Sequence, residues 1–160
     1  MEIDELSVSF LQYENDRSSR QTELPVISKL SVPVHEGEIV AVVGSSGSGK
    51  SLLAHAILNL LPYNARVSGE MYFDGMLLTP EKVNELRGNK IAFVPQSTTY
   101  LDPLMTVAGT VGGNRKNKAG RKKQRALFAR YGLDETVDKK YPFECSGGMI
   151  RRVLLTSAMM

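Results

Sequence analysis

A glycine-rich segment, GSSGSGKS at residues 44–51, constrains the fold more than any other part of the sequence. It matches the phosphate-binding loop pattern in full, and it lies between a β-branched run, IVAVV at 39–43, and an apolar stretch, SLLAHAILNLL at 51–61. The run is flanked by glycines, which predicts a buried parallel strand, and the apolar stretch predicts a helix that ends before Pro62. Strand, loop and helix in this order predict an α/β fold that binds a nucleoside triphosphate.

The residues of this loop suit the binding of phosphate. Its three glycines are expected to let the backbone turn tightly with positive φ, so that amide groups of the loop and of the following helix point at the β- and γ-phosphates. Lys50 supplies a mobile positive charge, and the Ser51 hydroxyl is placed to ligate Mg²⁺. The alternative, a serine-glycine linker before a core helix, does not explain why all the parts fall in register. The expected ATP-binding residues here are Gly44, Ser45, Ser46, Gly47, Ser48, Gly49, Lys50 and Ser51.

The other elements are predicted from periodicity and turn signals. They are strands at 6–13, 26–34 and 90–94, an exposed loop at 14–23, a hairpin at 69–78 with Asp74-Gly75 at its turn, and a short helix that begins at Thr79-Pro80. After Gln96 the sequence contains no good strand. It continues with a basic segment from Arg115 to Arg125 and a helix that ends near Tyr131. We therefore place a domain boundary after Gln96, between residues 1–96 and 97–160.

Two further motifs narrow the class of protein. Gln96 directly follows the predicted strand in KIAFVPQ, and CSGGM at 145–149 precedes the helical sequence IRRVLLTSAMM. With the phosphate loop, they resemble the nucleotide-binding domain of the ABC (ATP-binding cassette) ATPases, which carries a Walker A loop, a Q-loop glutamine and an LSGGQ signature in this order. The resemblance covers essentially the whole chain. It implies a P-loop NTPase (RecA-like) core with an antiparallel β subdomain, plus a helical ABC subdomain.

The resemblance also implies roles for the motif residues. Ser146, Gly147 and Gly148 would form a second phosphate clamp at a helix N-terminus, which reaches the γ-phosphate held by the Walker A loop of a partner subunit. Lys50 and Gln96 would be catalytic, and Ser51 and Gln96 would hold Mg²⁺ beside ATP. Taken alone, Ser-Gly-Gly is also typical of a plain helix-capping turn.

The signature departs from LSGGQ at two positions, Cys145 and Met149. Methionine there is familiar from the dipeptide, oligopeptide and nickel importers, whose stretch resembles YPxELSGGMxQRV, compared with YPFECSGGMIRRV here. STTYLDPLMTV, after Gln96, is also similar to that branch, and Cys145 could fill the packing role of the leucine. This branch implies an energy-coupling subunit of a peptide or nickel importer. Its partners would be membrane-spanning subunits, a second ATP-binding subunit and, indirectly, an extracytoplasmic substrate-binding protein.

The competing hypothesis is a soluble ABC-type ATPase that acts on nucleic acid or ribosomes. Such proteins usually carry coiled-coil or zinc insertions in the helical region, which here is short and has one cysteine. The basic segment could bind nucleic acid or anionic lipid, but no aromatic residues interleave with its charges, so a solvated face is favoured. The single cysteine, the acidic N-terminus and the lack of about 18 consecutive apolar residues favour the cytoplasmic face of a membrane.

Two further expectations concern adenine and the catalytic machinery. An aromatic residue at the end of the first strand stacks on adenine in this family, and Phe10 aligns best, with Tyr13 as the runner-up. Core packing is the alternative for both residues. In the family, a strand after the signature helix carries the Walker B aspartate and the catalytic glutamate. The sequence ends at Met160, within the signature helix, so we expect these 160 residues to lack part of the core and to be inactive alone.

Overall fold

The structure, a computed structural model, describes residues 1–13, 21–112 and 118–160. The chain divides into two compact units, Met1–Asn89 and Lys90–Met160, which are described separately below. The boundary that the sequence places after Gln96 lies further along the chain and remains a prediction. None of the described helices is both long and apolar enough to span a bilayer.

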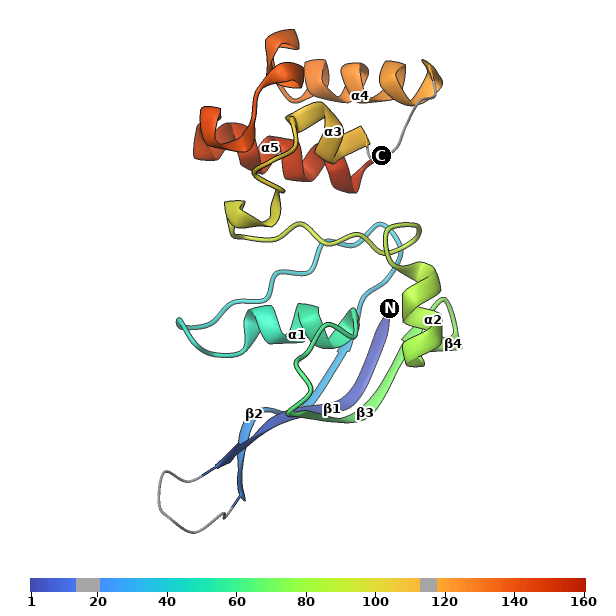
Figure 1. Cartoon of the computed structure of the whole chain (residues 1–160). Coiled ribbons are helices and arrows are strands. Elements are labelled where there is room, and N and C mark those ends of the chain that lie inside the picture. Colours follow the sequence, from blue (N-terminus) through green and yellow to red (C-terminus); the bar gives the residue numbers. More distant parts are fainter. Residues whose placement is uncertain (14–20, 113–117) are drawn as a thin grey trace. The chain divides into compact units, whose positions relative to one another are not determined.

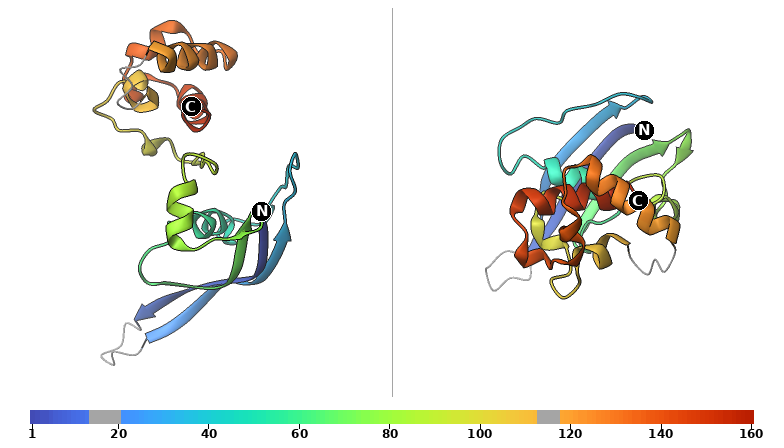
Figure 2. Two further views of the ribbon diagram at one scale, coloured as in Figure 1. Left: turned by 90° about the vertical axis from the view of Figure 1, so that its right-hand side faces the viewer. Right: turned by 90° about the horizontal axis from the view of Figure 1, so that it is seen from above.

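A four-stranded antiparallel sheet forms the frame of the first unit. Its strands are β1 (Glu2–Tyr13), β2 (Gln21–Pro33), β3 (Ala65–Phe73) and β4 (Met76–Leu77), in the order β2-β1-β3-β4. Figures 1 and 2 show β1 between its two long neighbours. This is the antiparallel sheet that the sequence predicts. The predicted loop at 14–23 is too long, because residues 21–23 already pair with β1, and residues 14–20 lie outside the described part.

Local turn and capping signals are confirmed in this unit. Asp74 and Gly75 join β3 to β4 with φ of 52° and 73°, the pair of positive values that a tight type I′ hairpin requires. Helix α2 (Pro80–Leu86) begins where predicted, because the Thr79 hydroxyl accepts a hydrogen bond from the Lys82 backbone N–H. Such signals depend on neighbouring residues alone, so the sequence is sufficient to predict them.

Helix α1 (Lys50–Ile57) lies against one face of the sheet (Figure 1). It buries Leu53 and Ala56 in a cluster with Ile3, Leu6 and Val8 of β1. Strict alternation would place Ile3 and Leu6 on opposite faces of the sheet, but the strand register shifts between them, where Glu5 has φ of 46°. Ile3, Leu6 and Val8 therefore all contact the helix. The helix ends before the predicted residue 61, because Asn59 adopts a left-handed conformation with φ of 51°.

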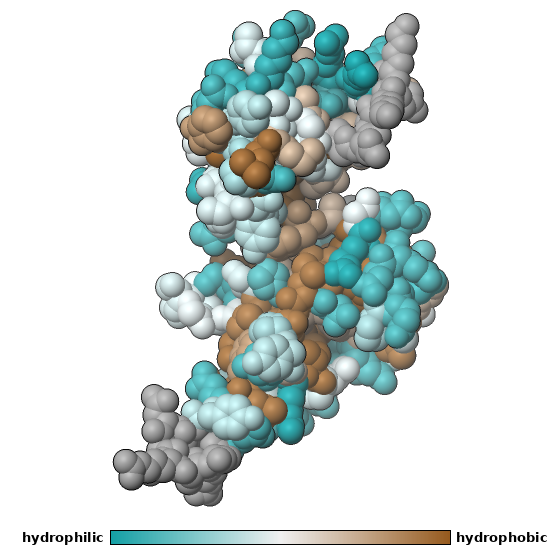
Figure 3. Space-filling view, in the orientation of Figure 1, coloured by the Kyte–Doolittle hydropathy of each residue, from teal (hydrophilic) through white to brown (hydrophobic). Residues whose placement is uncertain are grey.

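The predicted strands at 39–43 and 90–94 are wrong for the described structure. Residues 39–43 have no regular structure, and Ile39 and Val43 are 96% and 89% exposed. In the second segment only Ile91 makes an isolated bridge. A strand exists only when a neighbour satisfies its N–H and C=O groups, and the described sheet offers these two segments no parallel neighbour. Figure 3 shows hydrophobic residues at the surface of this unit, around α1.

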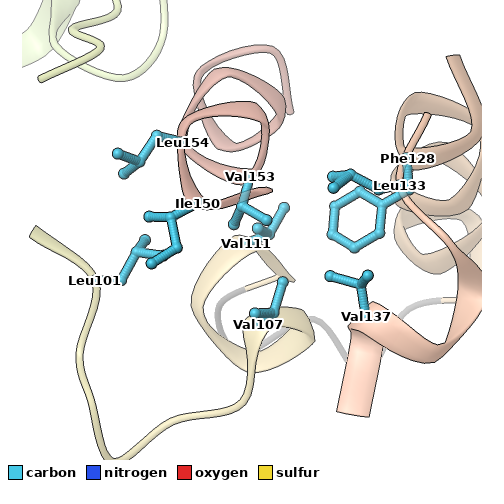
Figure 4. Packing of buried hydrophobic residues seen from close by; sticks show 9 residues of the cluster. All are labelled: Leu101, Val107, Val111, Phe128, Leu133, Val137, Ile150, Val153 and Leu154. Carbon is cyan, nitrogen blue, oxygen red and sulfur yellow. The ribbon is translucent and has the colours of Figure 1, made fainter. Parts of the chain in front are cut away.

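The second unit is helical in its described residues from Thr98 onward, as predicted. Its elements are η1 (Thr98–Tyr100), α3 (Val107–Gly112), α4 (Lys118–Arg130), η2 (Glu135–Lys139), η3 (Pro142–Glu144) and α5 (Gly147–Ala158). One hydrophobic cluster joins them: Leu101, Val107, Val111, Phe128, Leu133, Val137, Ile150, Val153 and Leu154 (Figure 4). Helix α5 supplies three of these side chains, so the core fixes the helix whose first turn carries the signature sequence.

Candidate functional site: two phosphate-binding elements

The phosphate loop of the first unit leads directly into α1. Gly49 is the N-cap of α1 and has φ of 87°, with no side-chain cap, so the first N–H groups of the helix remain available to an anion. Ser51 is the second helical residue, and it is exposed. Its hydroxyl is therefore accessible to a metal ion beside the loop.

The three glycines of the loop have different roles. Gly47 and Gly49 adopt positive φ, as predicted, but Gly44 does not, so the prediction of positive φ at Gly44 is wrong. Gly44 instead lies close to Ser48: a Cβ there would be 2.6 Å from the Ser48 hydroxyl oxygen, so a larger residue would force that side chain to move. A Cβ at Gly49 would lie 3.1 Å from Val26 Cγ1, so both the positive φ and this close contact favour glycine at this position.

The Lys50 ammonium lies within the loop. Its Nζ donates hydrogen bonds to the carbonyls of Gly44 at 2.9 Å and Ser45 at 2.6 Å, and to the Ser48 hydroxyl at 3.4 Å. The loop backbone therefore holds a positive charge at its own centre. Three donors on a flexible stem allow the ammonium to exchange such contacts for phosphate oxygens.

The signature sequence forms the N-terminus of α5 in the second unit. Ser146 is the N-cap, and its hydroxyl accepts a hydrogen bond from the Met149 N–H at 3.3 Å. Ser146, Gly147 and Gly148 are exposed, and a Cβ on either glycine would meet no atom within 4 Å. The turn is thus a helix cap, the alternative that the sequence analysis gives for Ser-Gly-Gly. It also leaves the positive end of a twelve-residue helix open to an anion.

The two departures from LSGGQ are both packing positions. Cys145 and Met149 are partly buried against the hydrophobic cluster of the second unit. Burial raises the pKa of the Cys145 thiol, the charge of Lys140 lowers it by less, and Glu144 raises it further. A raised thiol pKa disfavours the reactive thiolate. These observations fit the packing role proposed for Cys145.

Gln96 is exposed and follows the buried Pro95. It precedes η1, which contacts α5, so Gln96 and the signature belong to the same unit. The phosphate loop belongs to the other unit. The structure therefore describes the Walker A residues as one group and the Gln96 and signature residues as another, and the joint roles of Gln96 and Ser51 remain predictions.

Phe10 and Tyr13 have different environments on β1. Phe10 is partly buried and packs against the cluster beneath α1, whereas Tyr13 is 69% exposed and its hydroxyl accepts a hydrogen bond from Gln21 Nε2 at 2.8 Å. Core packing thus accounts for part of the Phe10 side chain. Phe10 is in the same unit as the phosphate loop, so adenine stacking remains a prediction for its exposed part.

The described residues fit ATP with Mg²⁺. The loop offers backbone N–H groups, the Lys50 ammonium and the Ser51 hydroxyl, which are the groups that a magnesium nucleotide requires from a phosphate-binding loop. Within the described ranges, no three His, Cys, Asp or Glu side chains are grouped to hold a metal ion.

Sequence comparison identifies relatives along almost the whole chain. The profile of the family described as ABC transporter matches residues 27–160. The peptidoglycan transport ATP-binding protein YejF of Agrobacterium fabrum is 37% identical over 147 residues, which cover 83% of this chain and 27% of that protein. The oligopeptide transport ATP-binding protein OppD of Salmonella typhimurium is 31% identical over 172 residues, covering 100% of this chain and 49% of OppD. This chain thus spans between about a quarter and a half of these two relatives.

The fold agrees with the sequence comparison. The cassette MJ0796, solved as a dimer in a post-hydrolysis state bound to ADP and Pi, superimposes with a TM-score of 0.80 at 25% identity, covering 99% of this chain and 68% of that chain. An export protein is also similar: the macrolide export ATP-binding/permease protein MacB of Syntrophobacter fumaroxidans is 35% identical over 149 residues, covering 88% of this chain and 20% of MacB. Both the predicted fold class and the predicted resemblance are confirmed.

Proposed function

Because this chain belongs to the ABC transporter family of ATP-binding proteins, we propose that it binds ATP as the energy-coupling part of a transporter. The observation that carries the proposal is the presence of two accessible phosphate-binding elements, one in each unit: the loop around Lys50 and the first turn of α5 at Ser146. A single nucleotide site would need only the first. Two elements of complementary kind suit a nucleotide bound between two subunits.

The proposed arrangement is a head-to-tail dimer of ATP-binding subunits. ATP with Mg²⁺ would contact the Walker A residues of one subunit and Ser146, Gly147 and Gly148 of the other. The dimeric cassette that shares this fold supports the proposal. In the intact protein, as its gene encodes it, we propose ATP hydrolysis, with Lys50 stabilising the charge on the phosphates, Ser51 ligating Mg²⁺ and Gln96 contacting Mg²⁺ and the attacking water.

An exposed apolar surface of the second unit supports a membrane-spanning partner. It comprises Tyr100, Leu104, Met105, Tyr141 and Phe143, of which Leu104 and Phe143 are 86% and 76% exposed. The rings of Tyr141 and Phe143 stack with centroids 5.6 Å apart. A hydrogen bond of 2.8 Å from the Val107 N–H to the Lys140 carbonyl brings the segments around residues 105 and 141 together. Grouped exposed aromatic and aliphatic side chains are typical of protein interfaces.

We propose that the transported substrate is a peptide or nickel. An extracytoplasmic substrate-binding protein would be an indirect partner of this chain. The support is the similarity of residues 141–153 to the peptide and nickel importer pattern and the similarity to OppD. MacB, an export protein, is also similar in sequence, so import is supported only by the pattern of residues 141–153 and by the similarity to OppD. The comparisons give no support to the alternative function on nucleic acid or ribosomes. The expected position is the cytoplasmic face of the membrane.

Capture of membrane subunits by the tagged intact protein tests the proposed function. We expect integral membrane subunits to co-purify with the wild type and to be lost from Phe143→Glu, because the substitution places a charge in the exposed apolar surface. Tyr63→Glu is the matched control, since Tyr63 is a fully exposed aromatic residue of the first unit. Recovery of ribosomes or nucleic acid, with no membrane protein, would contradict a transport function.

Nucleotide binding by Phe10 variants tests the adenine contact. Phe10→Leu keeps an apolar side chain on the core but removes the ring, so we expect MgATP affinity to fall roughly tenfold, the effect of one lost base-aromatic stack. Binding of magnesium triphosphate, which has no base, should not change, and Phe10→Tyr should behave as wild type. If Tyr13→Leu weakens MgATP binding while Phe10→Leu does not, Tyr13 is the stacking residue and the assignment of Phe10 is wrong.

A further inference from the structure

The guanidinium of Arg152 joins the end of α4 to the beginning of α5. Its Nη1 donates hydrogen bonds to the carbonyls of Tyr131 at 3.1 Å and Gly132 at 2.8 Å. Its Nε donates to the carbonyl of Gly148 at 3.2 Å. One side chain therefore bonds both to the two residues that follow α4 and to the first turn of the signature helix.

The geometry at the end of α4 explains why a cation is bound there. The Leu133 N–H bonds to the Phe128 carbonyl at 2.9 Å, and the Gly132 N–H bonds to the Ala129 carbonyl at 3.1 Å. With Gly132 at φ of 62°, this is a Schellman ending, which satisfies earlier carbonyls but not those of Tyr131 and Gly132. The negative end of the helix dipole adds to the attraction for a guanidinium with several donors.

The signature turn is held at its edges by Ser146, which caps α5, and by Cys145 and Met149, which pack against the hydrophobic cluster. Ser146 caps α5 through the Met149 N–H and its carbonyl accepts from the Ile150 N–H, but Gly147 and Gly148 have no side chains to pack. Two consecutive glycines lose more conformational entropy on ordering than other residues do. The bond from Arg152 to the Gly148 carbonyl is a side-chain restraint on this exposed part of the turn.

We propose that Arg152 is the positioning residue of the signature turn, holding Ser146 and the first N–H groups of α5 in place by anchoring Gly148 to the end of α4. The proposal rests on the proposed function in one respect, that this turn contacts the nucleotide of a partner subunit. The guanidinium also adds positive charge next to the first turn of α5, where an anion would bind.

The adjacent Arg151 provides a matched control. It is exposed, and within the described ranges its side chain makes no hydrogen bond or ion pair, so replacing it breaks none. Arg152→Lys keeps the charge, but a single ammonium cannot present the planar fork that reaches Gly148 on one side and the α4 carbonyls on the other. Arg152→Gln removes both charge and fork. Arg151→Gln controls for the loss of an arginine from this helix. Comparing Arg152→Lys with Arg152→Gln separates the effect of the charge from that of the hydrogen-bond geometry.

Hydrogen exchange of the α5 backbone amides measures the positioning effect directly in the intact protein. We expect exchange at Met149 and Ile150 to accelerate roughly tenfold in Arg152→Gln and Arg152→Lys, the effect of losing one charged hydrogen bond, with no change in Arg151→Gln. Exchange at Val153 and Leu154, deeper in the same helix, should change much less. Equal acceleration at all four amides would mean that Arg152 only stabilises the unit, and would overturn the proposal.

ATP-driven association of the intact protein measures the functional consequence. Both Arg152 variants should require roughly tenfold more protein to associate in MgATP, while the separate subunit binds MgATP as wild type does. Full recovery of association in Arg152→Lys would show that charge alone matters, and would overturn the positioning role. If the wild type itself does not associate with ATP, the proposed function fails, and hydrogen exchange alone then decides whether Arg152 holds the turn.

Discussion

Replacing Lys50 with alanine is expected to weaken MgATP binding by the intact protein by about a hundredfold or more. The ammonium lies within the phosphate loop, where it now bonds to the Gly44 and Ser45 carbonyls. Two charge-assisted contacts to phosphate oxygens are each worth about 1.5–3 kcal/mol, so their loss should lower the affinity for MgATP by more than about a hundredfold. Equilibrium binding of a fluorescent nucleotide, followed by competition with MgATP, measures the change.

Two further variants separate the lysine charge from its structural contacts. Lys50→Met keeps most of the side-chain length without the charge, and it should be as defective as alanine. Lys82→Ala removes an exposed lysine of the same unit that pairs with Glu85 at 2.8 Å, and it should bind MgATP normally. An unchanged dissociation constant in Lys50→Ala would remove the basis for assigning residues 44–51 as a phosphate-binding loop.

The sequence predicts best those features that a few neighbouring residues decide. The Asp74-Gly75 turn and the Thr79 cap occur where the sequence predicts them, and Ser146 caps α5, which the sequence offers as the alternative to a phosphate contact. Each depends on one turn of chain, in which a positive φ or a side-chain oxygen satisfies nearby backbone groups. The order of the three motifs was equally informative, because it led to the family that the comparisons confirm.

Features that depend on distant partners were predicted less well. IVAVV has a β-branched composition, but composition cannot supply the neighbouring strand that a ladder requires, and residues 39–43 are irregular in the structure. The sequence predicts a positive φ at Gly44, whereas the structure shows a close approach of the Ser48 hydroxyl, which the sequence does not indicate. Arg151 and Arg152 are adjacent residues of one type, and only the hydrogen bonds from Arg152 to the carbonyls of Tyr131 and Gly132 distinguish them.

Replacing Ser146 with arginine is expected to abolish ATP-driven association and turnover of the intact protein while leaving MgATP binding by the separate subunit unchanged. Ser146 is exposed at the N-terminus of α5, and it belongs to a different unit from the phosphate loop. In the proposed dimer this turn meets only the nucleotide of the partner subunit. An arginine side chain there fills the space for the phosphate, and its positive charge is repelled by the positive end of the helix.

The substitution also removes a helix cap, so its structural cost has to be measured separately. Loss of the bond from the Met149 N–H should cost about 1 kcal/mol of stability, and Ser146→Ala has this cost without the bulk or the charge. We therefore expect Ser146→Ala to retain some association, and Ser146→Thr, which keeps a capping oxygen, to retain more. Light scattering in MgATP and phosphate release, compared across the three variants, separate capping from occlusion. A loss of MgATP binding in the separate Ser146→Arg subunit as large as that of Lys50→Ala would place both residues around one nucleotide in one chain, contrary to a site shared between two subunits.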